Sequence, residues 1–114
     1  MWKDHSNEAR DLLNSFKRKG FEFGKPMKLL TFKSNLEEEE IKREIFNFDY
    51  LVFTDKQNRS KEIRYVLYFV YDKKKGRVFV ITFRDKIRVI TIYSLGQKSL
   101  KKYYKRKFKK DGKL

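Results

Sequence analysis

The fold depends on residues 62–93, whose sequence is EIRYVLYFVYDKKKGRVFVITFRDKIRVITIY. Valine, isoleucine, tyrosine and phenylalanine dominate this stretch, and these residue types are enriched in β-strands. It has two polar interruptions: residues 72–76, which include a glycine, and residues 85–86, which can make a tight turn. The stretch therefore predicts three antiparallel strands, over 62–71, 77–84 and 86–93.

Another strand is predicted over 46–54, and the polar residues 55–60 connect it to the next one. Four consecutive strands with short links predict an antiparallel meander. A turn at 85–86 predicts three cross-strand pairs on the face toward the core: Phe83 with Arg88, Ile81 with Ile90, and Phe79 with Ile92. The other face is more mixed in composition and is a candidate floor for a bound substrate.

A first helix is predicted over 6–19, with Ser6 as its N-cap. Its buried stripe has the i, i+3, i+4, i+7 spacing of an amphipathic helix and consists of Ala9, Leu12, Leu13 and Phe16. Gly20 supplies the left-handed residue that ends the helix. Phe21 and Phe23 are expected to fold back onto the stripe.

A second helix is predicted to begin near Asn35, after a short extended segment at 27–32. Ser34 and the acidic run 37–40 suit helix capping and the positive end of the helix dipole. The inner face is expected to hold Leu36, Ile41 and Ile45. A third, basic helix is predicted over 98–110. The predicted fold is thus α+β, with two N-terminal helices, a four-stranded antiparallel meander and a basic C-terminal helix.

The composition excludes several classes of site. A chain of 114 residues fits a single domain. It has no cysteine and only one histidine, so we predict no disulfide, no metal site and no cofactor. Residues 1–10 do not resemble a secretory signal, and no apolar run approaches the roughly 18 to 20 residues of a membrane span. A cytoplasmic location is expected.

Positive charge is concentrated in the second half of the chain. Residues 1–60 hold 12 Lys and Arg against 11 Asp and Glu, whereas residues 61–114 hold 18 against 4. This asymmetry predicts an extended positive potential that attracts phosphate backbones. An anionic membrane surface is the competing interpretation. We expect a nucleic-acid partner, RNA rather than DNA, and no membrane; the oligomeric state stays open.

The basic C-terminal helix is the predicted site of phosphate contact. Many like charges close together repel one another, so their presence needs a reason, and binding to phosphates supplies one. The predicted nucleic-acid-binding residues are Lys98, Lys101, Lys102, Lys105, Arg106 and Lys109. The alternative is that these side chains serve only solubility and the helix dipole.

Three arginines are candidates for a catalytic site: Arg64, Arg84 and Arg88. A guanidinium at a strand end can hold a scissile phosphate and stabilise the charge that develops during transfer. The alternative is that these arginines pair with Glu62 or Asp85, or are solvated.

Two further side chains are candidates for proton transfer. Tyr93 ends the last strand, where its hydroxyl can bond a phosphate or move a proton, although packing is the alternative role. Histidines titrate near neutrality, which makes His5 the other candidate. A solvated position in the N-terminal segment is the alternative for His5.

Four short segments resemble the RelE-like ribonuclease toxins, and among them the BrnT-type toxins. These segments are KRKGFEF at 17–23, EIRY at 62–65, DKIRVIT at 85–91 and KKY at 101–103. The resemblance implies a metal-independent ribonuclease whose basic and hydroxyl groups activate the ribose 2′-OH and stabilise the cyclising phosphate. It places Arg64, Arg88 and Tyr93 at the working surface. It also implies an antitoxin protein as a possible partner.

Three hypotheses therefore stand. The first is an endoribonuclease that uses the three arginines with Tyr93 or His5. The second is a non-catalytic RNA- or DNA-binding module in which exposed tyrosines stack on bases. The third is a structural or interaction protein, for example from a virus or a mobile element, that docks an acidic partner through its basic helix.

Overall fold

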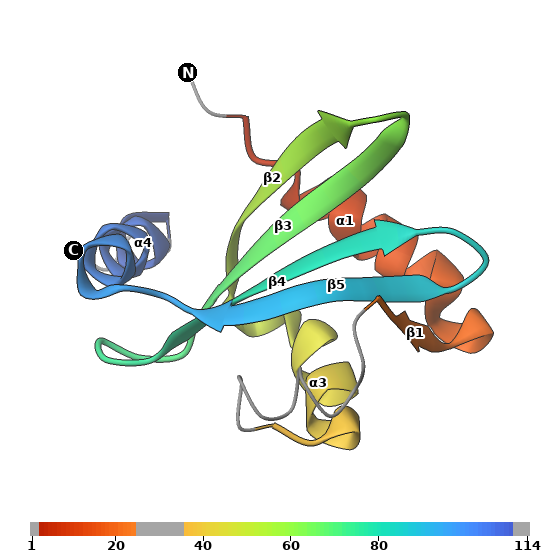
Figure 1. Cartoon of the computed structure of the whole chain (residues 1–114). Helices are drawn as coiled ribbons and strands as arrows, with labels where there is room; N and C mark the ends of the chain where they lie inside the picture. The colour runs from red at the N-terminus through yellow and green to blue at the C-terminus, as the bar shows by residue number, and fades with distance from the viewer. Residues whose placement is uncertain (1–2, 25–35, 111–114) are drawn as a thin grey trace.

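The computed structural model describes residues 3–24 and 36–110, and their side chains as far as residue 105. The fold is mixed α+β, with a five-stranded sheet and helices against it (Figure 1). The predicted α+β class is therefore confirmed. The extended segment predicted at 27–32 and the capping residues Ser34 and Asn35 lie outside the described residues.

The sheet contains one strand more than the sequence predicts. Its strands are β1 (Phe21–Phe23), β2 (Leu51–Arg59), β3 (Glu62–Val70), β4 (Gly76–Phe83) and β5 (Ile87–Ser94). They lie in the order β1-β5-β4-β3-β2. The antiparallel meander is β2 to β5, and β1 adds to it parallel to β5. A strand of only three residues is too short to show a period of two in the sequence, so β1 was missed.

The first meander strand lies later in the chain than predicted. The predicted strand 46–54 is displaced because Phe48–Tyr50 form a 3-10 turn, η2, ahead of β2. Residues 55–59, predicted as a connector, continue β2 and pair with β3. The connection is therefore the turn at Ser60 and Lys61, whose φ values are 46° and 69°. Two-residue hairpin turns favour this left-handed region.

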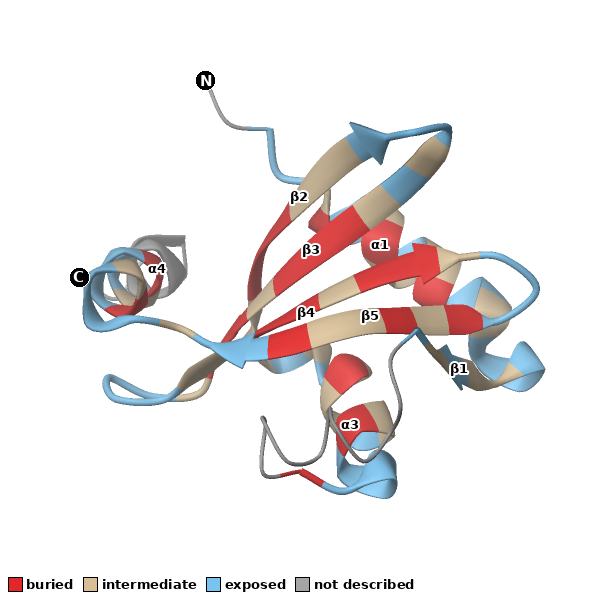
Figure 2. Ribbon diagram, in the orientation of Figure 1, coloured by how far each residue is buried: buried red, intermediate tan, exposed pale blue. Residues whose placement is uncertain are grey.

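Two helices, α1 (Ser6–Phe16) and α3 (Glu38–Ile45), cover one face of the sheet (Figure 1). Buried residues line the facing sides of helices and strands (Figure 2). Of the predicted inner positions, Ala9, Leu13, Ile41 and Ile45 are confirmed at 0% exposed, whereas Leu12 and Phe16 are only partly buried. The strand residues of this core are Tyr65, Leu67, Phe69, Phe79, Ile81, Ile87, Val89 and Ile92.

The start of α1 is tied to β2 by a carboxylate. Asp4 Oδ1 accepts hydrogen bonds from the backbone N–H groups of Ser6 at 3.0 Å and Thr54 at 3.1 Å. It also accepts the Ser6 hydroxyl at 2.6 Å, so Asp4 rather than Ser6 satisfies the free backbone donor. At its other end α1 continues into a 3-10 turn, η1 (Lys17–Lys19), which Gly20 ends with φ 87°.

The basic helix α4 (Gln97–Lys110) forms close to its predicted bounds and packs at one end of the opposite sheet face. Its Leu100 and Tyr103 are buried against Val52, Phe53 and Val70. Gly76 permits this packing, because a Cβ there would come within 2.6 Å and 2.7 Å of leucine methyl carbons at Leu95 and Leu100. Among the described helices, none is both long and apolar enough to cross a membrane.

Candidate functional site

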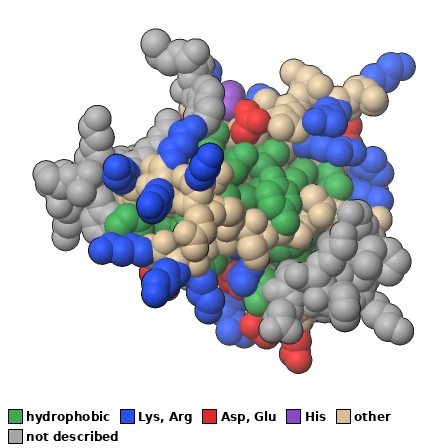
Figure 3. Space-filling model, turned by 60° about the vertical axis from the view of Figure 1, so that its left-hand side comes forward, with side chains coloured by type: hydrophobic (Ala, Val, Ile, Leu, Met, Phe, Trp, Pro, Cys, Tyr) green, Lys and Arg blue, Asp and Glu red, His purple; other side chains and the backbone are tan. Residues whose placement is uncertain are grey.

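The candidate site lies on the sheet face opposite α1 and α3, which we call the open face. Viewed from the side of α4, hydrophobic side chains occupy the middle of the molecule, with lysine and arginine side chains on both sides of them (Figure 3). One of these basic groups belongs to α4, where Lys98, Lys101, Lys102 and Lys105 are exposed. The side chains of Arg106 and Lys109 lie outside the described part of the chain.

A β-bulge in β5 decides which side chains reach the open face. Val80 pairs with Thr91, but the next residue, Ile81, pairs with Val89. Ile90 is therefore an extra residue that has no paired residue in β4. Such a bulge breaks the regular alternation of side chains between the two faces of a strand.

The bulge reverses the faces of the first part of β5. Ile87 and Val89 are 0% exposed in the core, although the sequence placed them on the mixed face. Arg88 consequently lies on the open face instead of the core face. Of the predicted pairs, Phe79 with Ile92 is confirmed, whereas Ile81 with Ile90 and Phe83 with Arg88 are wrong. These two pairs were wrong because regular alternation from the turn onward does not allow for a bulge.

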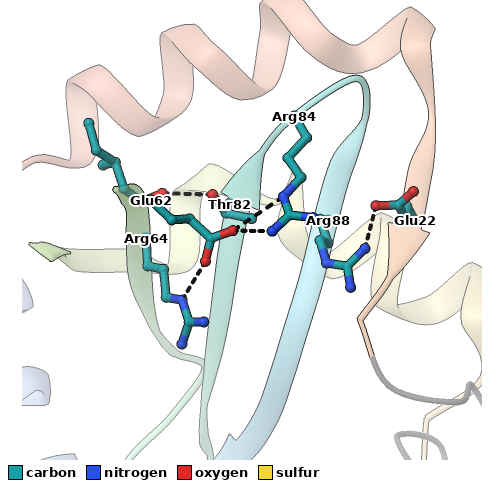
Figure 4. A network of polar contacts seen from close by, with 7 residues as sticks. Glu22, Glu62, Arg64, Thr82, Arg84 and Arg88 are labelled. Atoms are coloured by element: carbon teal, nitrogen blue, oxygen red, sulfur yellow. Dashed lines mark hydrogen bonds and ion pairs between the residues drawn. The ribbon is translucent and has the colours of Figure 1, made fainter. Parts of the chain in front are cut away.

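Arg88 completes a row of polar residues that crosses all five strands, which we call the polar row. Gln57 pairs with Arg64, Arg64 with Thr82, Thr82 with Arg88, and Arg88 with Glu22. Adjacent strands lie roughly 4.8 Å apart, so the backbones at Arg64 and Arg88 are about 10 Å apart. Arg64, Arg84 and Arg88 lie around Thr82, and each is bound to a glutamate (Figure 4).

Glu62 binds two of the candidate arginines. Its Oε2 accepts a hydrogen bond from Arg64 Nε at 2.9 Å, and its Oε1 accepts one from Arg84 Nη2 at 2.7 Å. These bonds, first the one from Arg64, lower the pKa of Glu62 below its ordinary value. From the sequence, Glu62 was only a possible ion-pair partner of the candidate arginines. Its position two residues before Arg64, on the same strand face, is the signal that could have identified it.

The third arginine is bound separately. Arg88 Nη1 donates to Glu22 Oε1 at 2.6 Å, and the Arg88 side chain is 28% exposed. Between the arginines, the buried Thr82 donates its hydroxyl to the Ile63 carbonyl at 2.7 Å. The threonine is short and its proton is already used, so it separates the guanidinium groups without offering a nucleophile.

A cavity of about 470 Å³ opens beside Glu62 and Arg84. Leu12 of α1, Tyr65 and Phe83 also line it, so the cavity lies at the strand ends, toward the helix-covered face. On the open face, three arginines are bound by two carboxylates, Glu62 and Glu22, so the charge of this group is positive and favours an anionic ligand.

His5 does not join the arginines. Its backbone N–H donates to the Thr54 carbonyl at 2.9 Å, and its Nδ1 lies 3.5 Å from Glu8 Oε1. Glu8 is also bound by Lys56 Nζ at 2.7 Å and by the Tyr65 hydroxyl, on the helix-covered face. These contacts, with Lys56 the strongest, lower the pKa of Glu8 to about 2. His5 thus belongs to a cluster on the other side of the sheet.

Tyr93 lies on the open face but away from the polar row. It pairs with Val78 and is 48% exposed. Because of the bulge, it lies four ladder positions from Arg88, as Val78 does from Thr82, which corresponds to about 13 Å along a strand. Tyr68 and Tyr103 lie on the same side. Burial, and then the phenols of Tyr103 and Tyr93, raise the pKa of Tyr68 to about 12. Tyr93 therefore lies nearer to α4 than the arginines do.

Among the described residues, the acidic run 37–40 forms its ion pairs within α3. Glu38 and Glu39 bind Lys42 of α3, at 3.3 Å and 3.5 Å. All four glutamates are exposed. Within residues 3–24 and 36–110, no three His, Cys, Asp or Glu side chains gather in a way that could hold a metal ion.

Comparison of the chain with protein-family models, curated proteins and solved structures finds no match. The function of this chain is therefore inferred from the geometry of the open face.

Proposed function

We propose that this chain is an RNA-binding protein that acts as a metal-independent endoribonuclease on its open face. One observation carries the proposal: the bulge in β5 brings Arg88 into line with Arg64, beside Arg84 and Glu62. Guanidinium groups bind phosphate through paired, charge-assisted hydrogen bonds. A carboxylate among them supplies a group that accepts a proton.

The reaction would be an internal transfer within the RNA. The ribose 2′-oxygen attacks the adjacent phosphorus and loses its proton to the Glu62 carboxylate. The bond from phosphorus to the 5′-oxygen breaks, and that oxygen takes a proton from water. The products are a 2′,3′-cyclic phosphate and a 5′-hydroxyl. Arg64, Arg84 and Arg88 stabilise the charge that gathers on the phosphate oxygens in the transition state.

Glu62 replaces Tyr93 and His5 as the proton acceptor in this proposal. His5 is bound on the other side of the sheet, and Tyr93 lies about 13 Å along β5 from Arg88. The Glu62 carboxylate is ionised in neutral solution, as an ordinary carboxyl group is, and can accept the proton. Its lowered pKa makes it a weaker base than a free glutamate.

The direct test is incubation of the purified protein with end-labelled RNA in EDTA. We expect cleavage products with 2′,3′-cyclic phosphate ends. Arg88→Ala should reduce the cleavage rate by about a hundredfold or more while barely changing RNA affinity. Arg43→Ala is the matched control, because Arg43 is an exposed arginine of α3. RNA that stays intact with the wild-type protein would refute the nuclease.

A non-catalytic RNA- or DNA-binding module is the second candidate. The exposed lysines of α4 favour it, because they offer phosphate contact remote from Glu62. Salt-sensitive binding by a wild-type protein that cleaves nothing would support this candidate. The antitoxin partner implied by the resemblance to RelE-like toxins stays a prediction, which co-expression with a neighbouring reading frame would test.

A further inference from the structure

We infer that the open face binds RNA as an unpaired strand, with its bases on a hydrophobic strip and Tyr93 as the stacking platform. This inference rests on the proposed function and adds the class of substrate. The strip consists of the open-face residues between the polar row and α4: Val66, Tyr68, Val78, Val80, Thr91 and Tyr93. Val66 and Val78 are buried within it, so its accessible surface comes from the other four residues.

The strip is set by the strand register. Val66 pairs with Val80, and Val80 with Thr91, which makes one row next to the polar row. Tyr68 pairs with Val78, and Val78 with Tyr93, which makes the following row toward α4. In sequence all these residues are interrupted by core residues, so only the sheet makes them contiguous. The hydrophobic area in the middle of Figure 3 lies on this face.

Cations lie at both ends of the strip. The arginines of the polar row lie at one end, and the exposed Lys98, Lys101 and Lys105 of α4 lie at the other. α4 starts at Gln97, shortly after β5 ends at Ser94, so its first turn stays close to Tyr93. A polynucleotide laid along this path would place phosphates at each end and bases over the strip between them.

The alternation of charge and apolar surface favours an unpaired strand over a duplex. In a duplex the bases are stacked inside and only the phosphates and groove edges face the protein. An apolar strip gives such a ligand nothing to contact. Bases of a single strand are free to stack on aromatic side chains, which every base can do because each has a π-face.

Tyr93 is the side chain placed for that stacking. Among the described residues, the exposed large hydrophobic side chains are Tyr93, at 48%, and Ile63, at 43%. Tyr93 lies one strand beyond Val78, which separates it from Tyr68, and the Tyr68 ring stacks on Tyr103 with centroids 4.8 Å apart. Tyr93 therefore lies on the same face as this packed aromatic pair, whereas Ile63 lies beside the turn between β2 and β3.

The test measures binding of a labelled 2′-O-methyl RNA, which lacks the attacking hydroxyl and so stays intact. The same strand annealed to its complement is the second ligand. We expect the wild-type protein to bind the single strand at least about tenfold more tightly than the duplex. Tyr93→Ala should weaken single-strand binding by about tenfold and leave duplex binding unchanged. Tyr93→Phe should keep wild-type affinity, because stacking needs the ring and not the hydroxyl.

Ile63→Ala is the matched control, since it removes a similarly exposed apolar side chain away from the strip, and it should bind like wild type. Equal affinity for strand and duplex would overturn the inference while leaving RNA binding and cleavage in place. The same holds if Tyr93→Ala binds the strand as tightly as Ile63→Ala does. No binding of either ligand at low salt would overturn the proposed function and this inference together.

Discussion

Thr82 and Arg88 lie opposite each other on the open face because Ile90 adds one residue to β5 between Thr91 and Val89. Without that extra residue Arg88 would point into the core, where an unpaired guanidinium is costly. With it, Ile87 and Val89 fill the core and Arg88 reaches Glu22. One residue thus serves the core and the candidate site at once. β-bulges commonly occur beside functional sites, where they redirect a side chain.

The proposed proton acceptor predicts a specific pH profile. Glu62→Gln should lower the cleavage rate by about a hundredfold or more, which is the usual contribution of a general base. Because the bound arginines lower the pKa of Glu62, the acid limb of the wild-type pH–rate profile should fall below the ordinary range of a carboxyl group. That limb should be missing in the variant. Glu40→Gln, at an exposed position of α3, should behave like wild type.

The lysines of α4 predict a steep salt dependence of RNA affinity. For a single strand, the log–log slope of affinity against salt changes by about 0.7 for each phosphate contact. Lys98→Ala and Lys101→Ala should each make the slope shallower by about that amount. Lys42→Ala should leave it unchanged, since Lys42 pairs with Glu38 on α3. An affinity that stays flat between low and physiological salt would contradict phosphate contact altogether.

Substitution by alanine is expected to have different effects at two glycines. Gly76→Ala would place a Cβ 2.7 Å from a methyl carbon of Leu100, where α4 packs on the sheet. We expect a loss of about 1–3 kcal/mol in the free energy of unfolding, the usual cost of overpacking. Gly96→Ala is the control, because no atom lies within 4 Å of its Cβ position. Urea denaturation of both variants would measure the difference, and equal midpoints would contradict this packing of α4.

The cluster around Glu8 predicts a loss of stability in acid. Its contacts with Lys56 and Tyr65 lower the pKa of Glu8 from 4.5 to about 2. The unfolded chain therefore binds a proton at a higher pH than the folded chain does. This contribution is complete above about pH 4.5 and disappears as the pH falls toward about 2.

Solvent screening reduces the size of that contribution, since the Glu8 side chain is 38% exposed. Thermal unfolding followed between pH 6 and pH 2 would measure it. Glu8→Gln should flatten the acid decline, whereas Glu40→Gln should leave it unchanged. A wild-type profile as flat as that of Glu8→Gln would contradict the assignment.

Much of the fold follows from local pattern. The apolar stripe of Ala9 and Leu13 has helical spacing, residues 62–93 alternate with a period of two, and the lysines of α4 are consecutive in the chain. Such signals depend only on near neighbours, so one sequence was sufficient to predict the α+β class, the main strands and the basic helix. It was likewise sufficient to select the three arginines as candidates.

The arrangement of those candidates depends on contacts between distant residues. The parallel pairing of β1 with β5 joins Glu22 to Arg88, and the bulge at Ile90 reverses the faces of Ile87 and Val89. Neither feature leaves a local signal, because strand pairing and register are chosen by how well the whole core packs. For the same reason only the tertiary structure separates His5 from the arginines and joins Arg84 to Glu62.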